Sequence, residues 1–254
     1  WKNMIPKIAI PSFERPDVLK NTLKVLEKNN INQEPYVFLE NKNQLDKYKN
    51  IKGCNFVITN TKGIQQKRNF IYDYFEANQY VISIDDDFVG VDKKNNKKLF
   101  PFNKIDELIK IGYIEMRKNN TCLFGLNIVS NPFFMKNKIQ FGNYLIAAGF
   151  YGFINQPNKL MHSVNPSGLC EDQETSLKVT KFFGGVIRFS GLTYSNPNYG
   201  NIEGGLQSLY NNIERKNKEK LGCKYLSKVY KDLCVIKPEG VGLKYKRIWT
   251  IKFM

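Results

Sequence analysis

Short apolar runs alternate with segments of helical apolar spacing over the first third of the chain, and this order constrains the fold more than any other feature. The predicted elements, in chain order, are a strand at 7–10, a helix from 16 to 28, a strand at 36–39, a polar helix at 44–48, a strand at 55–58, a helix through 70–75 and a strand at 80–84. A chain that alternates strand and helix in this way forms a parallel sheet with right-handed crossovers. The sequence therefore predicts an α/β fold with a mostly parallel, doubly wound central sheet flanked by helices.

The rest of the chain is expected to extend this sheet. We predict a charged loop at 92–98, an amphipathic helix at 105–117, strands at 123–126, 144–154 and 184–189, and a basic helix at 206–220. The composition changes from Asn196 onward, where basic and aromatic residues interleave up to Trp249. Such interleaving is typical of a tail that follows a nucleic-acid backbone and stacks on its bases, and equally of an amphipathic tail packed on the core.

The charge balance points to anionic partners. The chain has 39 Lys and Arg against 23 Asp and Glu, which gives a formal net charge of +16. An excess of this size favours polyanions or anionic surfaces. An AT-rich genome that encodes Lys and Asn freely would produce the same bias with solvated lysines, so charge alone leaves the partner open.

Composition also bears on the compartment. No run of about 18 apolar residues is present, so no membrane span is expected. The five cysteines, at positions 54, 122, 170, 223 and 234, are scattered without a CxxC pair. This pattern is typical of reduced thiols in an intracellular compartment and gives no indication of structural zinc. We therefore expect a cytoplasmic protein, whose oligomeric state has no signature in the sequence.

Three consecutive carboxylates, Asp85, Asp86 and Asp87, follow the buried strand at 80–84. Adjacent acids repel one another, and burying one without a partner is costly. A divalent cation at the carboxyl end of the strand would resolve this conflict, because Mg²⁺ and Mn²⁺ prefer oxygen ligands and can also hold a diphosphate. A solvated acidic turn is the alternative interpretation.

Lys67 and Arg68 stand near the predicted start of the helix that follows Gly63. Cations are unfavourable at that end of the helix dipole unless an anion is bound nearby, and phosphate is the obvious candidate. A surface helix with incidental basic residues would also explain them.

A second acidic cluster, Glu171 and Asp172, opens another predicted helix, where acids suit the helix dipole without any further role.

Together these motifs resemble a known enzyme class. The segment from Ile10 to Arg15, the segment 63–69, the triplet 85–87 and the later pair 171–172 occur in the order typical of GT-A glycosyltransferases, which use nucleotide sugars and have a Rossmann-like sheet. The resemblance covers about residues 5–190. Within that class, the SIDDD strand, the EDQE helix and the basic tail look like the TET/JBP-associated glycosyltransferases, which are linked to glycosylation of hydroxymethylated pyrimidines in kinetoplastid and phage DNA.

The resemblance implies a domain organisation and a role for each matching residue. Residues 1–195 would form the catalytic domain, with a nucleotide-sugar half at about 1–90 and an acceptor half at about 91–195, and 196–254 would be a basic extension packed on it. The implied donor-binding residues are Pro11, Ser12, Arg15, Glu40, Lys67, Arg68, Asp85 and Asp86, the implied metal ligands are Asp85 and Asp87, and the implied catalytic base is Asp172 with Glu171 as second choice. The cofactors would be Mn²⁺ or Mg²⁺ and a UDP-sugar.

The implied reaction is a single displacement onto the hydroxyl of 5-hydroxymethylcytosine or 5-hydroxymethyluracil in DNA. His162, the only histidine, precedes the Glu171–Asp172 pair, so we expect it in an acceptor loop or a structural role. Two other functions remain open at this stage. One is the same chemistry on a protein or polysaccharide acceptor, and the other is a catalytically silent nucleic-acid-binding module.

Overall fold

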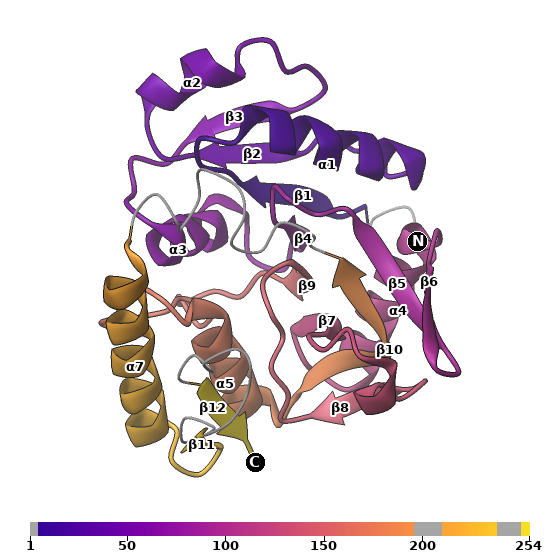
Figure 1. Cartoon of the computed structure of the whole chain (residues 1–254), viewed down its shortest axis with the longest axis vertical. Coiled ribbons are helices and arrows are strands. Elements are labelled where there is room, and N and C mark those ends of the chain that lie inside the picture. Colours follow the sequence, from indigo (N-terminus) through magenta and orange to yellow (C-terminus); the bar gives the residue numbers. More distant parts are fainter. Residues whose placement is uncertain (1–4, 196–209, 238–249) are drawn as a thin grey trace.

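The computed structural model describes residues 5–195, 210–237 and 250–254, which form a mixed α/β fold around one ten-stranded sheet (Figure 1). The sheet order is β3-β2-β1-β4-β9-β7-β10-β5-β6, and β8 pairs with β10. The strands are β1 Lys7–Pro11, β2 Tyr36–Leu39, β3 Asn55–Ile58, β4 Tyr80–Ile84, β5 Gly90–Asn95, β6 Lys98–Pro101, β7 Leu123–Asn127, β8 Ile139–Gly142, β9 Phe150–Ile154 and β10 Val186–Ser195. Strands β1 to β4 are mutually parallel, as predicted, and the mostly parallel central sheet is confirmed.

The helices cover both faces of this sheet. They are α1 Pro16–Lys28, α2 Lys42–Tyr48, α3 Ile64–Tyr74, α4 Ile105–Lys118, α5 Glu171–Phe183 and α7 Asn212–Val229, with a short 3-10 helix η1 at Pro132–Phe134. Alternate residues of each strand point to opposite faces. Thus Ile8 and Ile10 of β1 join one core cluster with α1 and α4, whereas Ala9 joins a second cluster with α3 and α5. Because both faces of the sheet are buried, successive residues of these strands are apolar in the sequence.

β9 makes the sheet mixed, which the β-α alternation of the first third could not predict. It runs antiparallel to β4 on one side and to β7 on the other. It is also shorter than the predicted strand at 144–154, because the chain before Phe150 bonds elsewhere. The backbone N–H of Ile146 donates to Ser176 Oγ of α5 at 3.0 Å, so this stretch is held by a helix side chain.

The predicted charged loop at 92–98 is wrong. These residues belong to the β5–β6 hairpin, in which Asn95 pairs with Lys98 across a two-residue turn and Asn96 has φ 54°. β5 pairs antiparallel with β10, so the hairpin extends the edge of the sheet. Charged side chains are compatible with an edge strand because they stay solvated and discourage further pairing. The run of lysines therefore indicated an edge hairpin.

The part of the C-terminal extension that the structure describes packs on α5, beside which α7 lies in Figure 1. Cys223 and Leu226 of α7 are buried with Leu177 of α5. Strands β11 Cys234–Lys237 and β12 Thr250–Phe253 pair antiparallel and add Cys234 and Ile251 to the same buried cluster. The predicted helix start at Leu206 and the basic aromatic ending at 244–249 lie outside the described residues. None of the described helices is long and apolar enough to cross a membrane.

A buried carboxylate on α5 holds the loop that precedes this helix. Glu174 is fully buried, and its Oε2 accepts hydrogen bonds from Ser163 Oγ at 2.6 Å and from the backbone N–H groups of Val164 and Asn165 at 3.0 and 2.9 Å. Three donors therefore share one acceptor group. Such a charge-assisted cluster orders the chain just before Glu171 and Asp172.

We expect Glu174→Ala to lower the free energy of unfolding by about 3 kcal/mol, because it leaves three buried donors without an acceptor. Urea unfolding followed by circular dichroism measures this change. Glu107→Ala, which removes an exposed glutamate from the first turn of α4, serves as the control and should shift stability by about 0.5 kcal/mol or less. Equal stabilities of the two variants would contradict the role assigned to Glu174.

Candidate functional site

The carboxyl ends of β1, β2 and β4 meet at one edge of the sheet, because these strands are parallel neighbours. Ser12, Glu40 and Asp85 each stand directly after one of these strands. Ligands of open α/β sheets bind at this edge. Pro11, the last residue of β1, is buried beneath it.

Ser12 connects the first strand to the acidic triplet. Its hydroxyl donates to Asp86 Oδ2 at 2.7 Å and lies 2.7 Å from the Tyr48 hydroxyl. Tyr48 in turn accepts from the backbone N–H of Arg15 at 2.9 Å. The Arg15 guanidinium lies 3.6 Å from Asp86 Oδ1 and 3.3 Å from Asp87 Oδ2. The predicted nucleoside-binding residues and the acidic triplet are therefore in direct contact.

Lys67 is buried, although it was predicted to reach a phosphate. Its Nζ donates to the backbone oxygen of Ser12 at 2.7 Å and lies 5.4 Å from the centre of the Phe13 ring. Burial lowers the pKa of Lys67 to about 8, and the nearby carboxylates of Glu40 and Asp86 oppose that shift. Glu40 Oε2 is buried and has no hydrogen-bond partner among the residues that the structure describes. Contact of Lys67 with a diphosphate stays a prediction.

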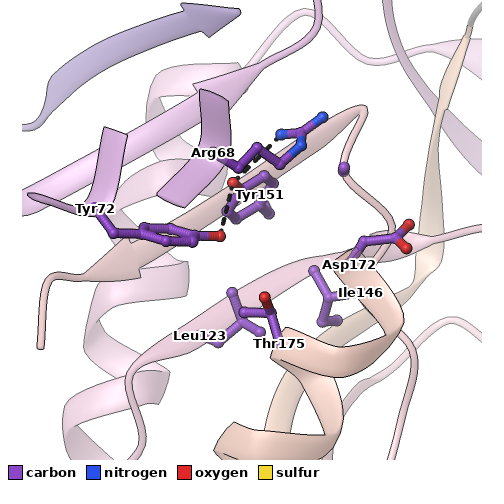
Figure 2. Close-up of a pocket in the computed structure, with 8 residues that line it drawn as sticks. Arg68, Tyr72, Leu123, Ile146, Tyr151, Asp172 and Thr175 are labelled. Carbon is purple, nitrogen blue, oxygen red and sulfur yellow. Dashed lines mark hydrogen bonds between the residues drawn. The ribbon is translucent and has the colours of Figure 1, made fainter. Parts of the chain in front are cut away.

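Arg68 joins the two acidic clusters. Its Nη2 lies 2.7 Å from Asp85 Oδ1, and its Nε lies 3.1 Å from Glu171 Oε1. Its Nη1 donates to the Tyr151 hydroxyl at 3.3 Å. Figure 2 shows Arg68 and Tyr72 both directed at the Tyr151 hydroxyl, which lies 3.1 Å from that of Tyr72. One guanidinium thus spans the carboxyl end of β4 and the start of α5.

Asp172 lines a small pocket beside this network. The pocket is lined by Arg68, Tyr72, Leu123, Ile146, Ala148, Tyr151, Asp172 and Thr175 (Figure 2). Asp172 Oδ1 accepts from the backbone N–H of Gln173 at 2.8 Å in the first turn of α5. The helix dipole also favours its negative charge there. Cys170, the residue before α5, has φ 62°. This left-handed turn places Glu171 and Asp172 in the first turn of the helix.

Burial raises the proton affinity of these acids. It raises the pKa of Asp85 to about 6 against the opposing charge of Arg68, and the pKa of Asp86 to about 7 against the Ser12 hydrogen bond. Burial also raises the pKa values of Glu171 and Asp172. A carboxylate with a raised pKa is a stronger base, which suits proton abstraction near neutral pH.

The donor set suits a hard divalent cation only in part. Asp85 and Asp87 offer carboxylate oxygens at the sheet edge, but each also pairs with an arginine. Within residues 5–195, 210–237 and 250–254, no group of three or more His, Cys, Asp or Glu side chains could hold a metal ion. Two carboxylates are sufficient for Mg²⁺ where substrate phosphates and water complete the coordination.

His162 pairs with α3. Its Nε2 lies 2.9 Å from Asp73 Oδ1, and its backbone oxygen accepts from Lys178 Nζ of α5. The imidazole is buried and its ring lies 6.2 Å from that of Tyr72. Burial lowers the pKa of His162 below its ordinary value of 6.5, with the Asp73 charge opposing. These contacts favour the structural role over the acceptor-loop role.

This pKa shift predicts a pH dependence of stability. The folded protein favours the neutral imidazole, so the unfolded chain binds the proton first as the pH falls through 6.5. We expect wild type to lose stability relative to His162→Gln as the pH is lowered from 8 towards 5, as measured by urea unfolding at each pH. The buried acids are the same in both proteins, so their contribution cancels in the difference between the two unfolding free energies at each pH. Parallel stability curves would contradict the prediction.

Three site residues were missed in the sequence: Tyr48, Tyr151 and Tyr194. Tyr48 ends α2 and bonds Ser12, and Tyr151 lies in β9 and bonds Arg68. Tyr194 of β10 is placed where the charges of Asp85 and Asp172 both add to the effect of burial in raising its pKa. A tyrosine at the end of a helix or within a strand gives no sequence signal that separates a site residue from a core residue.

Comparisons with known proteins find distant structural likenesses. 4-diphosphocytidyl-2C-methyl-D-erythritol synthase from Anaerococcus prevotii is 12% identical, with a TM-score of 0.43 over 77% of this chain and 92% of that one. UDP-glucose pyrophosphorylase complexed with UDP-glucose is 11% identical, with a TM-score of 0.47 over 76% and 92%. The bifunctional IspDF from Campylobacter jejuni is 11% identical, with a TM-score of 0.39 over 66% and 46%. No protein-family model and no curated protein sequence matches the chain.

Proposed function

We propose that this protein is a glycosyltransferase that moves a sugar from a nucleotide-sugar donor to the hydroxyl of a hydroxymethylated pyrimidine in DNA. The observation that carries the proposal is the position of Arg68, which pairs with Asp85 and with Glu171. Two acidic clusters far apart in the sequence thereby face one sheet edge. Glycosyl transfer needs two such groups, one at the departing diphosphate and one at the attacking hydroxyl.

The donor half would use the contacts around β1 and β4. Ser12, Arg15 and Glu40 border the space where a nucleoside would lie, with Lys67 beneath them. Asp85 and Asp87 would hold Mn²⁺ or Mg²⁺ together with the donor phosphates, and Asp86 would contact the ribose or the sugar. When bound, the cation would neutralise the charge that develops on the departing diphosphate.

The acceptor half would use Asp172 as the general base. The acceptor oxygen forms a bond to the anomeric carbon while the bond from that carbon to the phosphate oxygen breaks. The nucleoside diphosphate leaves with the bonding electrons, and the hydroxyl proton passes to the Asp172 carboxylate. Arg68 would keep Glu171 ionised and fixed beside Asp172, since the two acids are adjacent and Glu171 is buried.

DNA is the proposed acceptor because of the charge. A net charge of +16 would attract a polyanion, and binding should weaken steeply with salt. A hydroxymethyl group projects into the major groove, so the enzyme could reach it there or after extruding the base. A protein or polysaccharide acceptor predicts activity that is indifferent to DNA.

The test is transfer from a panel of nucleotide sugars with Mn²⁺ to DNA that contains 5-hydroxymethylcytosine or 5-hydroxymethyluracil, with unmodified DNA as the control. The expected result is a mass gain of one sugar on the hydroxymethylated DNA alone. Donor hydrolysis without labelling of DNA would indicate a glycosyltransferase whose acceptor is a protein or a glycan. Release of pyrophosphate when the protein is given a nucleoside triphosphate and a sugar phosphate would show that it is a nucleotidyltransferase and not a glycosyltransferase.

Asp87→Ala tests the donor site separately. We expect loss of the Mn²⁺-dependent part of UDP-sugar binding, a decrease in affinity of about tenfold or more, because one of two carboxylate ligands is removed. Isothermal titration with and without Mn²⁺ measures it. Asp106→Ala, which removes a half-buried acid that pairs with Lys110 in α4, is the matched control. Unchanged donor affinity in Asp87→Ala would remove this residue from the metal site.

A further inference from the structure

The segment 131–141, which follows β7, exposes an unusual amount of aromatic surface. Phe133 is 84% exposed and Phe134 is 65% exposed, and the two rings contact each other at a centroid distance of 5.0 Å. Ile139 and Phe141 of the same segment are also exposed. Single exposed apolar residues need no explanation, but a contiguous group commonly marks an interaction site.

The backbone under these rings is firmly held. Asn131 Oδ1 accepts from the backbone N–H of Phe133 at 3.0 Å and caps η1. Met135 is 2% exposed and anchors the segment in the core. Lys136 donates its backbone N–H to the oxygen of Ser190, and Ser190 donates to the oxygen of Lys138, both at 3.0 Å. The phenyl rings are therefore presented on an ordered turn.

Positive charge accompanies the rings in the same segment. Lys136 and Lys138 are exposed within the segment. Lys94 Nζ donates to the backbone oxygen of Met135 at 2.6 Å, which places the β5–β6 hairpin beside the segment. The sequence has no aspartate or glutamate between Glu115 and Glu171. No carboxylate of this stretch would repel a phosphate.

We propose that this basic aromatic surface, formed by Phe133, Phe134, Lys136 and Lys138, binds single-stranded DNA. Bases stack on the phenyl faces and the lysines contact the phosphates, an arrangement that binds single strands without sequence preference. The inference rests on the proposed function in that it supplies the acceptor strand to the same enzyme.

An anionic membrane is the other surface that exposed phenylalanines and lysines could meet. The exposed side-chain amide of Asn137 stands between the two lysines of the segment. Such an amide can hydrogen-bond to base edges, whereas a bilayer would have to dehydrate it without a partner. The segment is therefore better suited to nucleic acid than to lipid.

The test compares Phe133→Ala/Phe134→Ala with Phe182→Ala, which removes a phenyl ring that is 70% exposed at the end of α5. Binding of a fluorescein-labelled, unmodified oligothymidylate is measured by anisotropy. We expect the double variant to bind about tenfold or more weakly and the control to match wild type. Lys136→Gln/Lys138→Gln should reduce the slope of log affinity against log salt by about 1.4, for two lost phosphate contacts.

Equal affinity of the double variant and the Phe182 control would overturn the inference, as would a wild type that does not bind the oligonucleotide. Sedimentation with phosphatidylserine–phosphatidylcholine vesicles tests the membrane: loss of vesicle binding with unchanged DNA binding in the double variant would also overturn it. The anisotropy measurement of DNA binding does not depend on sugar transfer. If wild type transfers no sugar to hydroxymethylated DNA, the proposed function fails while DNA binding still decides the surface.

Discussion

Asp172→Asn is expected to lower turnover by about 10²-fold or more while leaving donor affinity close to that of wild type. The amide keeps the shape of the side chain and can still accept the Gln173 N–H bond, but it cannot take the proton of the attacking hydroxyl. Steady-state transfer to hydroxymethylated DNA gives turnover, and titration with the UDP-sugar gives donor affinity. A loss confined to turnover is the signature of a base that acts after binding.

Asp17→Asn is a close control for this substitution. Asp17 and Asp172 are both the second residue of a helix, so each change removes the same favourable interaction with a helix dipole. Asp17 is solvent-exposed in α1 and pairs with Lys20 at the surface. Near-normal turnover in Asp172→Asn would place the base elsewhere, with Glu171 as the next candidate.

Arg68→Gln is expected to lower the free energy of unfolding by about 3 kcal/mol, because it leaves the buried carboxylate of Glu171 and the half-buried carboxylate of Asp85 without their cation. Urea unfolding at pH 7 measures this change. Arg188→Gln is the control: Arg188 stacks on Tyr144 at 3.9 Å, and no ion pair joins it to a carboxylate of the described residues. A similar loss in both variants would mean that the ion pairs of Arg68 add nothing beyond the packing of a guanidinium.

Arg68→Lys separates positioning from stability. Lysine keeps the charge but lacks the planar fork that contacts both acids at once. We expect most of the stability to return while turnover stays at least about tenfold below wild type, with a small change in KM. Full recovery of turnover would show that charge alone suffices and would exclude a positioning role for Arg68.

Much of the fold could be predicted because local pattern and tertiary burial agree in it. Helix α1 begins at the predicted Pro16 with Asp17 in its first turn and ends before Asn29, and β4 ends at Ile84, where the three carboxylates begin. The β5–β6 hairpin was missed for the opposite reason. Its charged residues lie on a solvated sheet edge, where hydrophobic alternation is weak and the pairing with β10 depends on residues about a hundred positions away.

The sequence by itself determined which residues are candidates for the site: Ser12 and Arg15 after β1, the triplet at 85–87, and the pair at 171–172. These signals are local, since each follows from carboxylates or small polar residues at the end of an apolar run or the start of a helix. Only the tertiary structure decided how the candidates combine. Arg68 looks in the sequence like a surface cation facing a phosphate, yet it is buried and paired with Asp85 and Glu171. The Arg68–Glu171 pair joins residues 103 positions apart and depends on how α3 and α5 pack on the sheet, and no local pattern encodes that geometry.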